Sequence, residues 1–379
     1  MSLDSLIRIA VVIPKYGLVG GAEGFVFHLT EGLAQREGLD VHVFANKWRR
    51  GNSPITFHKV PIMRFPRWIQ PVSFAYFAQK AIQAGSYDIV HSHDRIFEMD
   101  LFTFHGIPHR AWIKETKRDR LSFFDRAMVW VEQKGVNNLN EPVILPVSNL
   151  VKEEFLKCYD VPESRILVIH PGVSMGRFCS LNREVCRQEI RQLYGLSSND
   201  VVVLFVSMNF ELKRLDLVIR GIAGVAKEED QNLGIKLLVV GKGDPKRFME
   251  LARDLGILER VIFTGVTAEV EKYYLASDVF AMPSKFDTFG LAVLEAMAAG
   301  LPVIITSRVG ARDLVQSGVN GFVLSNSPSV SEMTAALNVL MQREMRLQMG
   351  ANNRQVALQH TWDNASGRVF ELYHRVKPP

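Results

Sequence analysis

The chain has little cysteine and no long apolar run. Its 379 residues include three cysteines, Cys158, Cys179 and Cys186, an odd number without paired metal-ligand spacing. We therefore expect ordinary thiols of a reducing compartment, no disulfide and no metal site. No apolar run approaches the roughly 18 residues that a membrane-spanning helix needs, so export and a spanning anchor are not expected. These absences favour a cytoplasmic globular protein.

An excess of charge of one sign is also lacking. Lysine and arginine together number 45 and the acidic residues 40, which leaves a formal charge of +5. This balance permits an anionic substrate or an anionic membrane surface without requiring either, and we predict no nucleic-acid partner. Low-complexity tracts and short repeats are missing from the sequence. With 47% hydrophobic residues, a chain of this length is expected to form two domains.

Short β-branched runs alternate with longer helical patterns along the whole chain, which is typical of parallel sheets with crossover helices. The first series of predicted strands covers residues 7–14, 40–45, 55–61, 88–93, 101–106 and 143–148. The second covers residues 201–208, 235–241, 260–265, 278–284, 302–307 and 321–325. We therefore predict an α/β fold with two facing, doubly wound Rossmann-like domains and a ligand cleft between them.

The domain boundary is expected where the first series ends. We place the N-terminal domain at residues 1–172 and the C-terminal domain at residues 173–358. Residues 359–379 carry apolar side chains at helical spacing, including Trp362, Val369 and Leu372. This predicts a C-terminal helix that crosses back to the first domain.

Glycine-rich turns follow a strand in each half of the chain. Gly20 and Gly21 stand between the first strand and a helix, and Gly241 and Gly243 follow a strand of the second series. Small residues let backbone amides approach a ligand, and a helix N-terminus favours an anion. A tight strand-to-helix turn explains the first pair equally well, because it is neither a Walker loop nor a full GxGxxG pattern.

The stretch "KFDTFGLAVLEAMAAG" places two carboxylates, Asp287 and Glu295, around the start of a helix. Turn-forming residues precede a run of good helix formers, so Asp287 is expected in the loop and Glu295 within the helix. The amides after Phe289 begin that helix and could receive an anion. Lys213 and Arg214 follow the first strand of the same domain, and two cations with two helix N-termini would suit a pyrophosphate. Taken singly, lysine and arginine residues in such a loop are more often solvated surface residues.

The order and spacing of several motifs resemble retaining family 4 glycosyltransferases with the GT-B fold. They are "NFELKRLDLVIRGIA", "VVGKGD", "VIFTGVT", "YYLASDVFAMPSKFDTFGLAVLEAMAAGLPVIITSRVGARDLV" and "NGFVL", with "GGAEGFVFHLTEGLA", "YDIVHSHD" and "TFHG" in the first half. The resemblance covers nearly the whole chain. Within the family, the chain looks most similar to lipopolysaccharide-core sugar transferases of the heptose glucosyltransferase type.

The resemblance implies a role for each residue of the second-domain motifs. Glu295 would hold the ribose hydroxyls, Asp287 the hydroxyls of the donor sugar, and Lys213 the developing charge on the leaving nucleoside diphosphate. The other implied donor-binding residues are Arg177 as a second cation, Arg214, the glycines Gly20, Gly21, Gly241 and Gly243, the Val266 backbone at the base edge, and the amides of Phe289, Gly290 and Leu291.

Two departures from the family pattern concern specificity. The family usually has glutamate at the position of Asp287, one methylene longer. The arginine that normally accompanies the lysine is missing, since the candidate positions hold Ser207, Met208 and Leu212, and Arg214 is the available substitute.

In the first domain, His105 matches a family histidine near the reacting sugar, and Asp100, which lies in the same region of the sequence, is a further catalytic candidate. The implied mechanism is a front-face displacement in which the departing phosphate acts as base, so no enzymic nucleophile, metal or cofactor is expected. His91 and His93 alternate at a strand end and resemble zinc ligands superficially, but this pattern is more often structural.

Residues 108–135 form a basic and aromatic segment in the half that should bind the acceptor. Its apolar and basic side chains could lie together on an anionic membrane. The apolar side chains are Trp112, Phe123, Phe124, Met128 and Trp130, and the flanking basic ones are Arg110, Lys114, Lys117, Arg118, Arg120 and Arg126. A helix pair packed on its own sheet, with a solvated basic face, explains the segment nearly as well.

The resemblance thus implies transfer of a sugar from a nucleotide-sugar donor, with a UDP-hexose as the leading candidate, to a saccharide or lipid-linked saccharide. Two alternatives remain open. One is a nucleotide-sugar epimerase or hydrolase of the same fold, and the other is a non-catalytic nucleotide-sugar-binding subunit.

Overall fold

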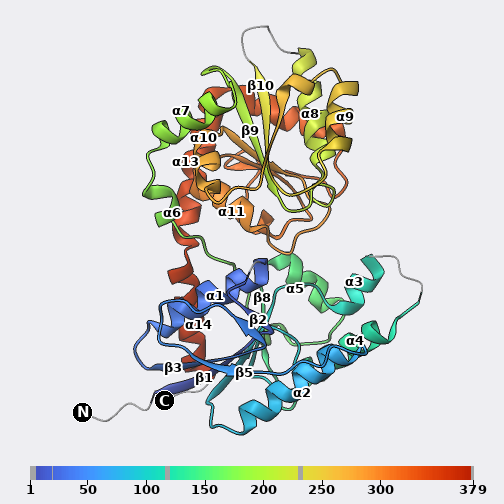
Figure 1. Ribbon diagram of the computed structural model, residues 1–379, viewed down its shortest axis with the longest axis vertical. Helices are drawn as coiled ribbons and strands as arrows, with labels where there is room; N and C mark the ends of the chain where they lie inside the picture. Colours follow the sequence, from blue (N-terminus) through green and yellow to red (C-terminus); the bar gives the residue numbers. More distant parts are fainter. Residues whose placement is uncertain (1–5, 19, 116–119, 229–233, 377–379) are drawn as a thin grey trace. The chain divides into compact units, whose positions relative to one another are not determined.

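The structure is a computed structural model that describes residues 6–18, 20–115, 120–228 and 234–376 and divides into two compact units (Figure 1). Unit 1 comprises the chain up to Gly172 together with the C-terminal segment from Trp362. Unit 2 comprises Val173–Thr361. Each unit has its own six-stranded sheet.

The sheet of unit 1 is parallel throughout, in the order β5-β3-β1-β6-β7-β8. Its strands are β1 (Ile7–Val12), β3 (Leu39–Ala45), β5 (Thr56–Lys59), β6 (Ile89–Ser92), β7 (Leu101–Phe104) and β8 (Val143–Pro146). The short strands β2 (Lys15–Tyr16) and β4 (Lys47–Trp48) pair separately and were not predicted. Burial on both faces explains the continuous apolar runs, as in the last four residues of β1.

Helices connect and cover the strands of unit 1. They are α1 (Gly21–Ala34), α2 (Ile69–Gln83), α3 (His109–Glu115), α4 (Phe123–Val136), α5 (Asn149–Leu156), the turn η1 (Glu163–Arg165) and α14 (Trp362–Val376). The C-terminal helix α14 packs on α1, where a Cβ on Gly32 would touch Ser366 at 3.0 Å. Tyr373 of α14 is fully buried and its hydroxyl lies 2.7 Å from His91 Nδ1. The predicted C-terminal helix therefore forms and completes the core of the first unit.

The sheet of unit 2 has the order β11-β10-β9-β12-β13-β14 and is also parallel. Its strands are β9 (Val201–Ser207), β10 (Ile235–Gly241), β11 (Val261–Gly265), β12 (Val279–Met282), β13 (Val303–Thr306) and β14 (Gly321–Leu324). Its helices and turns are α6 (Gly176–Cys179), α7 (Arg183–Leu193), α8 (Leu215–Glu228), α9 (Lys246–Asp254), η2 (Leu258–Arg260), α10 (Val270–Ala276), α11 (Leu291–Ala298), η3 (Gly310–Leu314), α12 (Val330–Met341) and α13 (Arg343–Gln359).

The prediction of two doubly wound α/β domains is confirmed, and each run predicted as a strand contains one. Helix α7 follows the domain boundary, and Asn182 caps it by accepting bonds from the amides of Glu184 (2.9 Å) and Val185 (3.2 Å). The cleft between the domains stays a prediction. Within the described ranges, no helix has both the length and the apolar character needed to cross a membrane.

Candidate active site

A pocket of about 430 Å³ lies in unit 2 at the carboxyl ends of its strands. Ser207 ends β9, Gly241 ends β10 and Met282 ends β12, and all three line it. The chain runs from β9 outward to β10 on one side and returns to β12 on the other, so the pocket lies at the switch point of the sheet. Open α/β sheets bind ligands at such points.

Lys213 and Asp287 form an ion pair in the wall of this pocket. Lys213 lies in the loop between β9 and α8, Asp287 lies in the loop between β12 and α11, and the ammonium donates to Asp287 Oδ2. The backbone of Asp287 is anchored, because its N–H donates to the Arg308 carbonyl and its carbonyl accepts from the Gly310 N–H, both at 2.9 Å. The Lys213 ammonium is thus fixed in the pocket wall, and an anion that enters the pocket could replace the Asp287 carboxylate as its partner.

The second oxygen of Asp287 explains why a shorter acid suits this loop. Asp287 Oδ1 accepts from the N–H of Phe289, two residues on, at 3.3 Å. Aspartate commonly bonds the backbone two residues ahead in this way and thereby stabilises a turn. The same contact corrects the predicted diphosphate cradle, because the Phe289 amide is engaged by Asp287 and does not line the pocket. Gly290 and Leu291 do line it.

Gly290 is the residue that allows helix α11 to start at the pocket. It has φ 90°, in the left-handed region, and a Cβ there would come within 2.9 Å of Met282 Cε and 3.1 Å of Val309 Cγ1. A glycine is therefore required by both backbone and packing. The first amides of α11 have no partner within the helix and carry the positive end of its dipole. Together with Lys213 they make this end of the pocket attractive to a phosphate.

Glu295 does not line the pocket itself, but it lies on the same helix and on the same face as two residues that do. It follows Leu291 by four positions and Ala292 by three, which places the side chains on one stripe. Glu295 Oε1 accepts from Arg177 Nη1 at 2.9 Å, and Oε2 accepts from the Tyr274 hydroxyl at 3.0 Å. Burial raises the pKa of Glu295, although Arg177 opposes the shift. The carboxylate is oriented, and its remaining lone pairs could accept ribose hydroxyls.

Arg177 does not line the pocket, since it forms ion pairs with Glu295 and with Glu271. In this structure Arg177 orients Glu295, and its predicted role beside the leaving group stays a prediction. Arg214, with φ 57°, is also outside the lining residues, which leaves Lys213 as the lysine or arginine that lines the pocket among the described residues.

The two glycines after β10 differ in their surroundings. Gly241 lines the pocket at φ 128°, and a Cβ there would collide with the Ser207 carbonyl on the neighbouring strand. Gly243 instead lies against the ring of Phe210 and outside the pocket lining, so its predicted place along the nucleotide is not supported. Val266 is 66% exposed and lines the pocket, and the contact of its backbone with a base stays a prediction.

In unit 1, His105 and Asp100 lie at opposite ends of β7. Asp100 precedes the strand and His105 follows it, so about 3.3 Å per residue separates them by roughly 16 Å. Asp100 Oδ2 accepts from the Val90 amide at 2.8 Å, which ties two strands together. Asp100 therefore cannot act on the same atoms as His105, and its predicted catalytic role is wrong.

His105 is at the carboxyl edge of the unit 1 sheet. Its Nε2 lies 3.1 Å from His93 Nδ1, and its ring meets Phe25 with centroids 4.8 Å apart. Burial lowers the pKa of His105 to about 3, so the imidazole is neutral at physiological pH. His91 bonds Tyr373 and Thr103, each at 2.7 Å, which gives this histidine a structural role.

The predicted anion site at Gly20 and Gly21 is occupied by an acidic side chain. Gly20 precedes α1 with φ 154°, and the Glu23 carboxylate lies where a Gly20 Cβ would project. Burial raises the pKa of the Asp94 carboxyl, Arg95 opposes that shift, and the charge of Glu23 adds to it. Two nearby carboxylates disfavour a phosphate here. They suit the hydroxyl groups of a sugar better.

Both halves of the chain match family profiles. Residues 187–356 match the family described as Glycosyl transferases group 1, and residues 19–177 match Glycosyltransferase Family 4. The chain is a group 1 glycosyltransferase. A similar curated relative is the D-inositol 3-phosphate glycosyltransferase of Gordonia bronchialis, which is 28% identical in an alignment that covers 96% of this chain and 85% of the relative.

Solved structures agree on the fold of this glycosyltransferase. WaaG, described as a glycosyltransferase involved in lipopolysaccharide biosynthesis, is similar with a TM-score of 0.80 and 21% identity, covering 98% of this chain and 100% of WaaG. HepE of Anabaena, in complex with UDP and glucose, has a TM-score of 0.72 and 18% identity, covering 97% of this chain and 100% of HepE. These likenesses show the GT-B fold.

Sequence reasoning missed several residues of the glycosyltransferase that orient the predicted ones. Tyr274 and Glu271 hold Glu295 and Arg177 from helix α10, and Glu23 and Asp94 form the acidic edge of unit 1. The tyrosine stands in the recognised "YYLASD" motif, yet only the folded structure shows that its hydroxyl reaches Glu295. The sequence did contain a signal for the acidic edge, because Glu23 closely follows the glycine pair and Asp94 directly follows "HSH".

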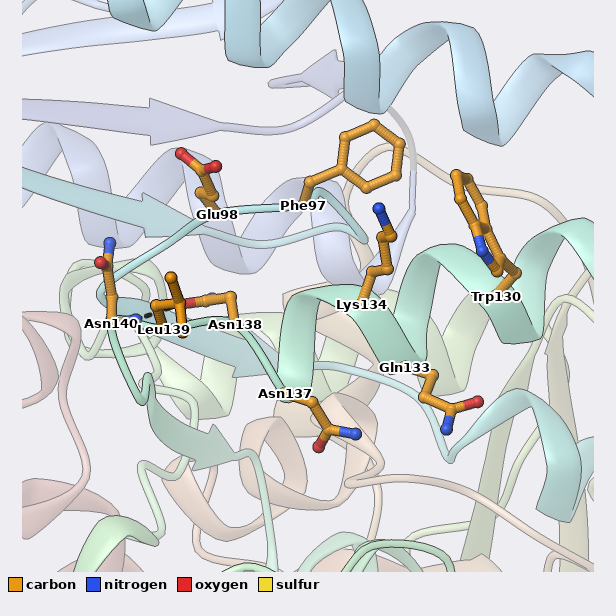
Figure 2. A pocket seen from close by; sticks show the side chains of 9 residues that line it. All are labelled: Phe97, Glu98, Trp130, Gln133, Lys134, Asn137, Asn138, Leu139 and Asn140. Carbon is orange, nitrogen blue, oxygen red and sulfur yellow. Dashed lines mark hydrogen bonds between the residues drawn. The ribbon is translucent and has the colours of Figure 1, made fainter.

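A larger hollow of about 770 Å³ in unit 1 lies away from the carboxyl edge. Glu98 precedes β7 and Asn140 precedes β8, so the hollow belongs to the amino-terminal side of the sheet. Figure 2 shows Lys134 reaching between the rings of Phe97 and Trp130, 5.8 and 5.2 Å from their centroids. Because Lys134 fills the space between the two aromatic rings, this hollow has no role in the proposed reaction.

The basic and aromatic segment of the glycosyltransferase is partly described. Lys117 and Arg118 lie outside the described residues. Helix α4 packs on α2 and α3 through its buried face, as the simpler alternative expected. Its opposite face nevertheless exposes Phe123 (74%) and Trp130 (46%), with Arg126 beside them. Spacings of three and four residues put these three side chains on one side of the helix.

Proposed function

We propose that this glycosyltransferase moves a hexose, with retention of configuration, from a UDP-hexose to a saccharide acceptor in the synthesis of a lipopolysaccharide core or another cell-surface glycan. The observation that carries the proposal is the pocket at the switch point of unit 2. The Lys213–Asp287 pair and the first residues of α11 both line this space of about 430 Å³.

The donor would lie along this pocket in a defined direction. The diphosphate would bind to Lys213 and to the first amides of α11. The sugar hydroxyls would donate hydrogen bonds to Asp287, and the ribose hydroxyls would donate to Glu295. The exposed Val266 backbone would then meet the base. The HepE structure with UDP and glucose supports this choice of donor class, because that protein has the same fold.

The reaction would proceed at one face of the donor sugar. The acceptor hydroxyl oxygen forms a bond to the anomeric carbon while the bond from that carbon to the diphosphate oxygen breaks. The proton of the hydroxyl passes to the departing phosphate oxygen, so configuration is retained and no enzymic nucleophile is used. Lys213 and the α11 amides stabilise the charge that develops on the leaving group, and positioning supplies much of the remaining rate.

No metal ion takes part in the proposed reaction, because Lys213 and the helix N-terminus supply the positive charge. Full turnover in the presence of EDTA is the expected result. A loss of turnover that added Mg²⁺ or Mn²⁺ restores would contradict this part of the proposal.

The acceptor would bind to unit 1, where Glu23, Asp94 and neutral His105 offer acceptors for sugar hydroxyls. The role of WaaG in lipopolysaccharide biosynthesis supports a glycan acceptor. The name of the 28% identical relative favours a second candidate, a phosphorylated cyclitol such as inositol 3-phosphate. The acidic edge argues for the uncharged hydroxyl-rich acceptor, since it would repel a phosphate.

A lipid-linked acceptor would bring the protein to a membrane, and the outer face of α4 fits that task. Exposed Phe123 and Trp130 could enter the lipid interface while Arg126 meets anionic headgroups. We expect the protein to sediment with phosphatidylglycerol vesicles and the variant Phe123→Ser/Trp130→Ser to stay in solution. The matched control is Leu193→Ser, an exposed apolar residue of unit 2. Equal sedimentation of the wild type and the double variant would contradict this docking face.

The test of the function is a product assay with labelled UDP-hexose, a truncated lipopolysaccharide core and inositol 3-phosphate. We expect transfer to the core, with the α-linkage of the donor retained in the NMR spectrum of the product. Lys213→Ala and Glu295→Ala should each lower transfer sharply, by roughly 10²–10³ for Lys213→Ala, whereas the exposed Lys227→Ala should not. Rapid release of free or epimerised sugar without acceptor would favour the hydrolase or epimerase alternative. Donor binding without any product would favour a non-catalytic subunit.

A further inference from the structure

A second cavity lies in unit 2 at the opposite edge of its sheet, with a volume of about 790 Å³. Its lining includes Asp200, which precedes β9, Asp278, which precedes β12, and Leu301, which precedes β13. Strand β9 has seven residues, so its two ends lie roughly 20 Å apart. The cavity is thus separate from the donor pocket.

Arginine dominates the lining of this cavity, which we call the arginine pocket. Its arginines come from α7 and α13: Arg183, Arg187, Arg343, Arg346 and Arg354. Asp278 is already shared by Arg187 at 3.0 Å and Arg191 at 2.7 Å. Asp200 accepts from the Ser197 amide at 2.7 Å. In the part of the chain that the structure describes, Arg187 is the arginine of the pocket lining that has a carboxylate partner.

Backbone carbonyls hold three of these guanidinium groups in place. Arg183 donates to the carbonyls of Ala299 and Leu275, and Arg346 donates to those of Leu340 and Met341, the latter two at 2.7 Å. Arg187 uses Nη1 for both of its protein partners, the Ala276 carbonyl and Asp278. Its Nε and Nη2 therefore have no partner among the described residues. The site is pre-arranged, because these arginines need not be ordered by a ligand.

The arginines also repel one another. Burial lowers the pKa of Arg183, and the charges of Arg187 and Arg354 lower it further, while the carboxylates of Asp278 and Glu184 oppose the shift. Burial likewise lowers the pKa of Arg346; Asp278 opposes this, whereas Arg187 and Arg343 add to it. A bound anion would remove this repulsion, since opposite charge favours the charged form of each guanidinium.

The amino end of α13 adds to the positive potential. This helix has 17 residues, and Gln342 before it makes no side-chain cap bond to the described helix. Arg343 and Arg346 occupy its first turn, where a basic side chain is unfavourable next to the helix dipole. Glu344 in the same turn offsets part of this positive potential, and the uncapped amides with two arginines still favour an anion.

We propose that the arginine pocket binds the phosphate group of a small phosphorylated molecule, between the guanidinium groups of α7 and α13 and the first amides of α13. Arginine matches phosphate oxygens with paired N–H donors, which suits this group better than a lone lysine would. The site is a second anion site of this chain, and it does not depend on the donor reaction.

The experiment is calorimetric titration of the full chain with inorganic phosphate and with a hexose 6-phosphate, in the presence of saturating UDP. Filling the donor pocket with UDP keeps phosphate away from Lys213. The test variant is Arg343→Gln/Arg354→Gln, because both side chains are exposed and Arg354 has only Cys179 Sγ, at 3.4 Å, as a described hydrogen-bond partner. The control is Arg220→Gln, an exposed arginine of α8 outside the lining.

We expect phosphate to bind in the presence of UDP, the double variant to weaken it by about tenfold or more, and Arg220→Gln to leave it unchanged. A parallel arm with phosphatidic acid vesicles distinguishes the source: binding in either arm that requires both arginines supports the site, and the arm that binds identifies the carrier. Displacement of phosphate by UDP, an equal response to chloride at matched ionic strength, or unchanged binding by the double variant would overturn the proposal.

Discussion

Replacing Lys213 by alanine tests the chemistry of the donor pocket. The ammonium pairs with Asp287 in the resting site, and both side chains are less than one-fifth exposed, at 17% and 19%. In the proposed reaction Lys213 meets the leaving diphosphate, whose charge grows in the transition state. Removing one such group from a pre-arranged site lowers kcat by roughly 10²–10³, or about 3–4 kcal/mol of barrier.

The same substitution should have a much smaller effect on folding. Asp287 keeps its bond to the Phe289 amide, at 3.3 Å, and its anchored backbone. We therefore expect a loss of about 1–2 kcal/mol in the free energy of unfolding, since one partner of a charged hydrogen bond is removed. The melting temperature should fall by only a few degrees, roughly 2–4 °C per kcal/mol for a unit of this size.

The assay is steady-state turnover of labelled UDP-hexose, with thermal unfolding of the same preparations. Asp287→Ala and the double variant complete a cycle. If Asp287 acts partly by holding Lys213, the double variant will be less impaired than the sum of the single effects. Turnover of Lys213→Ala within fivefold of the wild type, in protein that melts normally, would refute the proposed role.

Three further outcomes follow from the geometry. Gly290→Ala should destabilise the protein by roughly 1–3 kcal/mol in thermal unfolding, because φ 90° is strained for alanine and its Cβ would press on Met282. UDP affinity should fall as the pH drops toward the raised pKa of Glu295, because only the ionised carboxylate accepts both ribose hydroxyls. Glu295→Gln should bind UDP weakly, with a flat pH profile in calorimetry. His105→Asn should raise the KM for the acceptor while UDP affinity stays the same, and an equal loss of both would contradict its place on the acceptor side.

The pKa of Glu295 also has a consequence for stability, and its sign is opposite to that of a salt-bridged acid. Because burial raises this pKa in the folded state, ionisation is less favourable there than in the unfolded chain. Its contribution is therefore most favourable below the unfolded pKa and is lost as the pH rises through the folded value. The Arg177 and Tyr274 contacts limit that loss without reversing it.

The fold was predictable because local patterns of apolar residues determine where its strands and helices form. Runs such as residues 201–208 are apolar on both faces, and only a parallel sheet covered on both sides buries them. The short strands β2 and β4 were missed, since two residues carry no periodicity. Strand β7 shows why the site was harder to predict than the fold. Asp100 and His105 are five positions apart in sequence, yet an extended strand places them at opposite edges of the sheet.

Roles that depend on long-range partners could not be read from the sequence. Lys213 and Asp287 are 74 positions apart, and Arg177 and Glu295 are 118 apart. In the sequence, nothing indicated a partner for Arg177, but in the folded chain it forms ion pairs with Glu271 and Glu295. Likewise, the acid at Gly20 and the arginine pocket arise from residues that the fold brings together.

The central claim is that the switch-point pocket of unit 2 binds a nucleoside diphosphate sugar. Calorimetric titration with the UDP, GDP, ADP and TDP forms of glucose tests it most directly, on the wild type, Lys213→Ala/Glu295→Ala and the control Lys227→Ala. We predict tightest binding of UDP-glucose by the wild type and the control, and a loss of at least tenfold in the double variant. If no nucleotide sugar binds, or if the double variant binds as tightly as the wild type, the pocket is not the donor site.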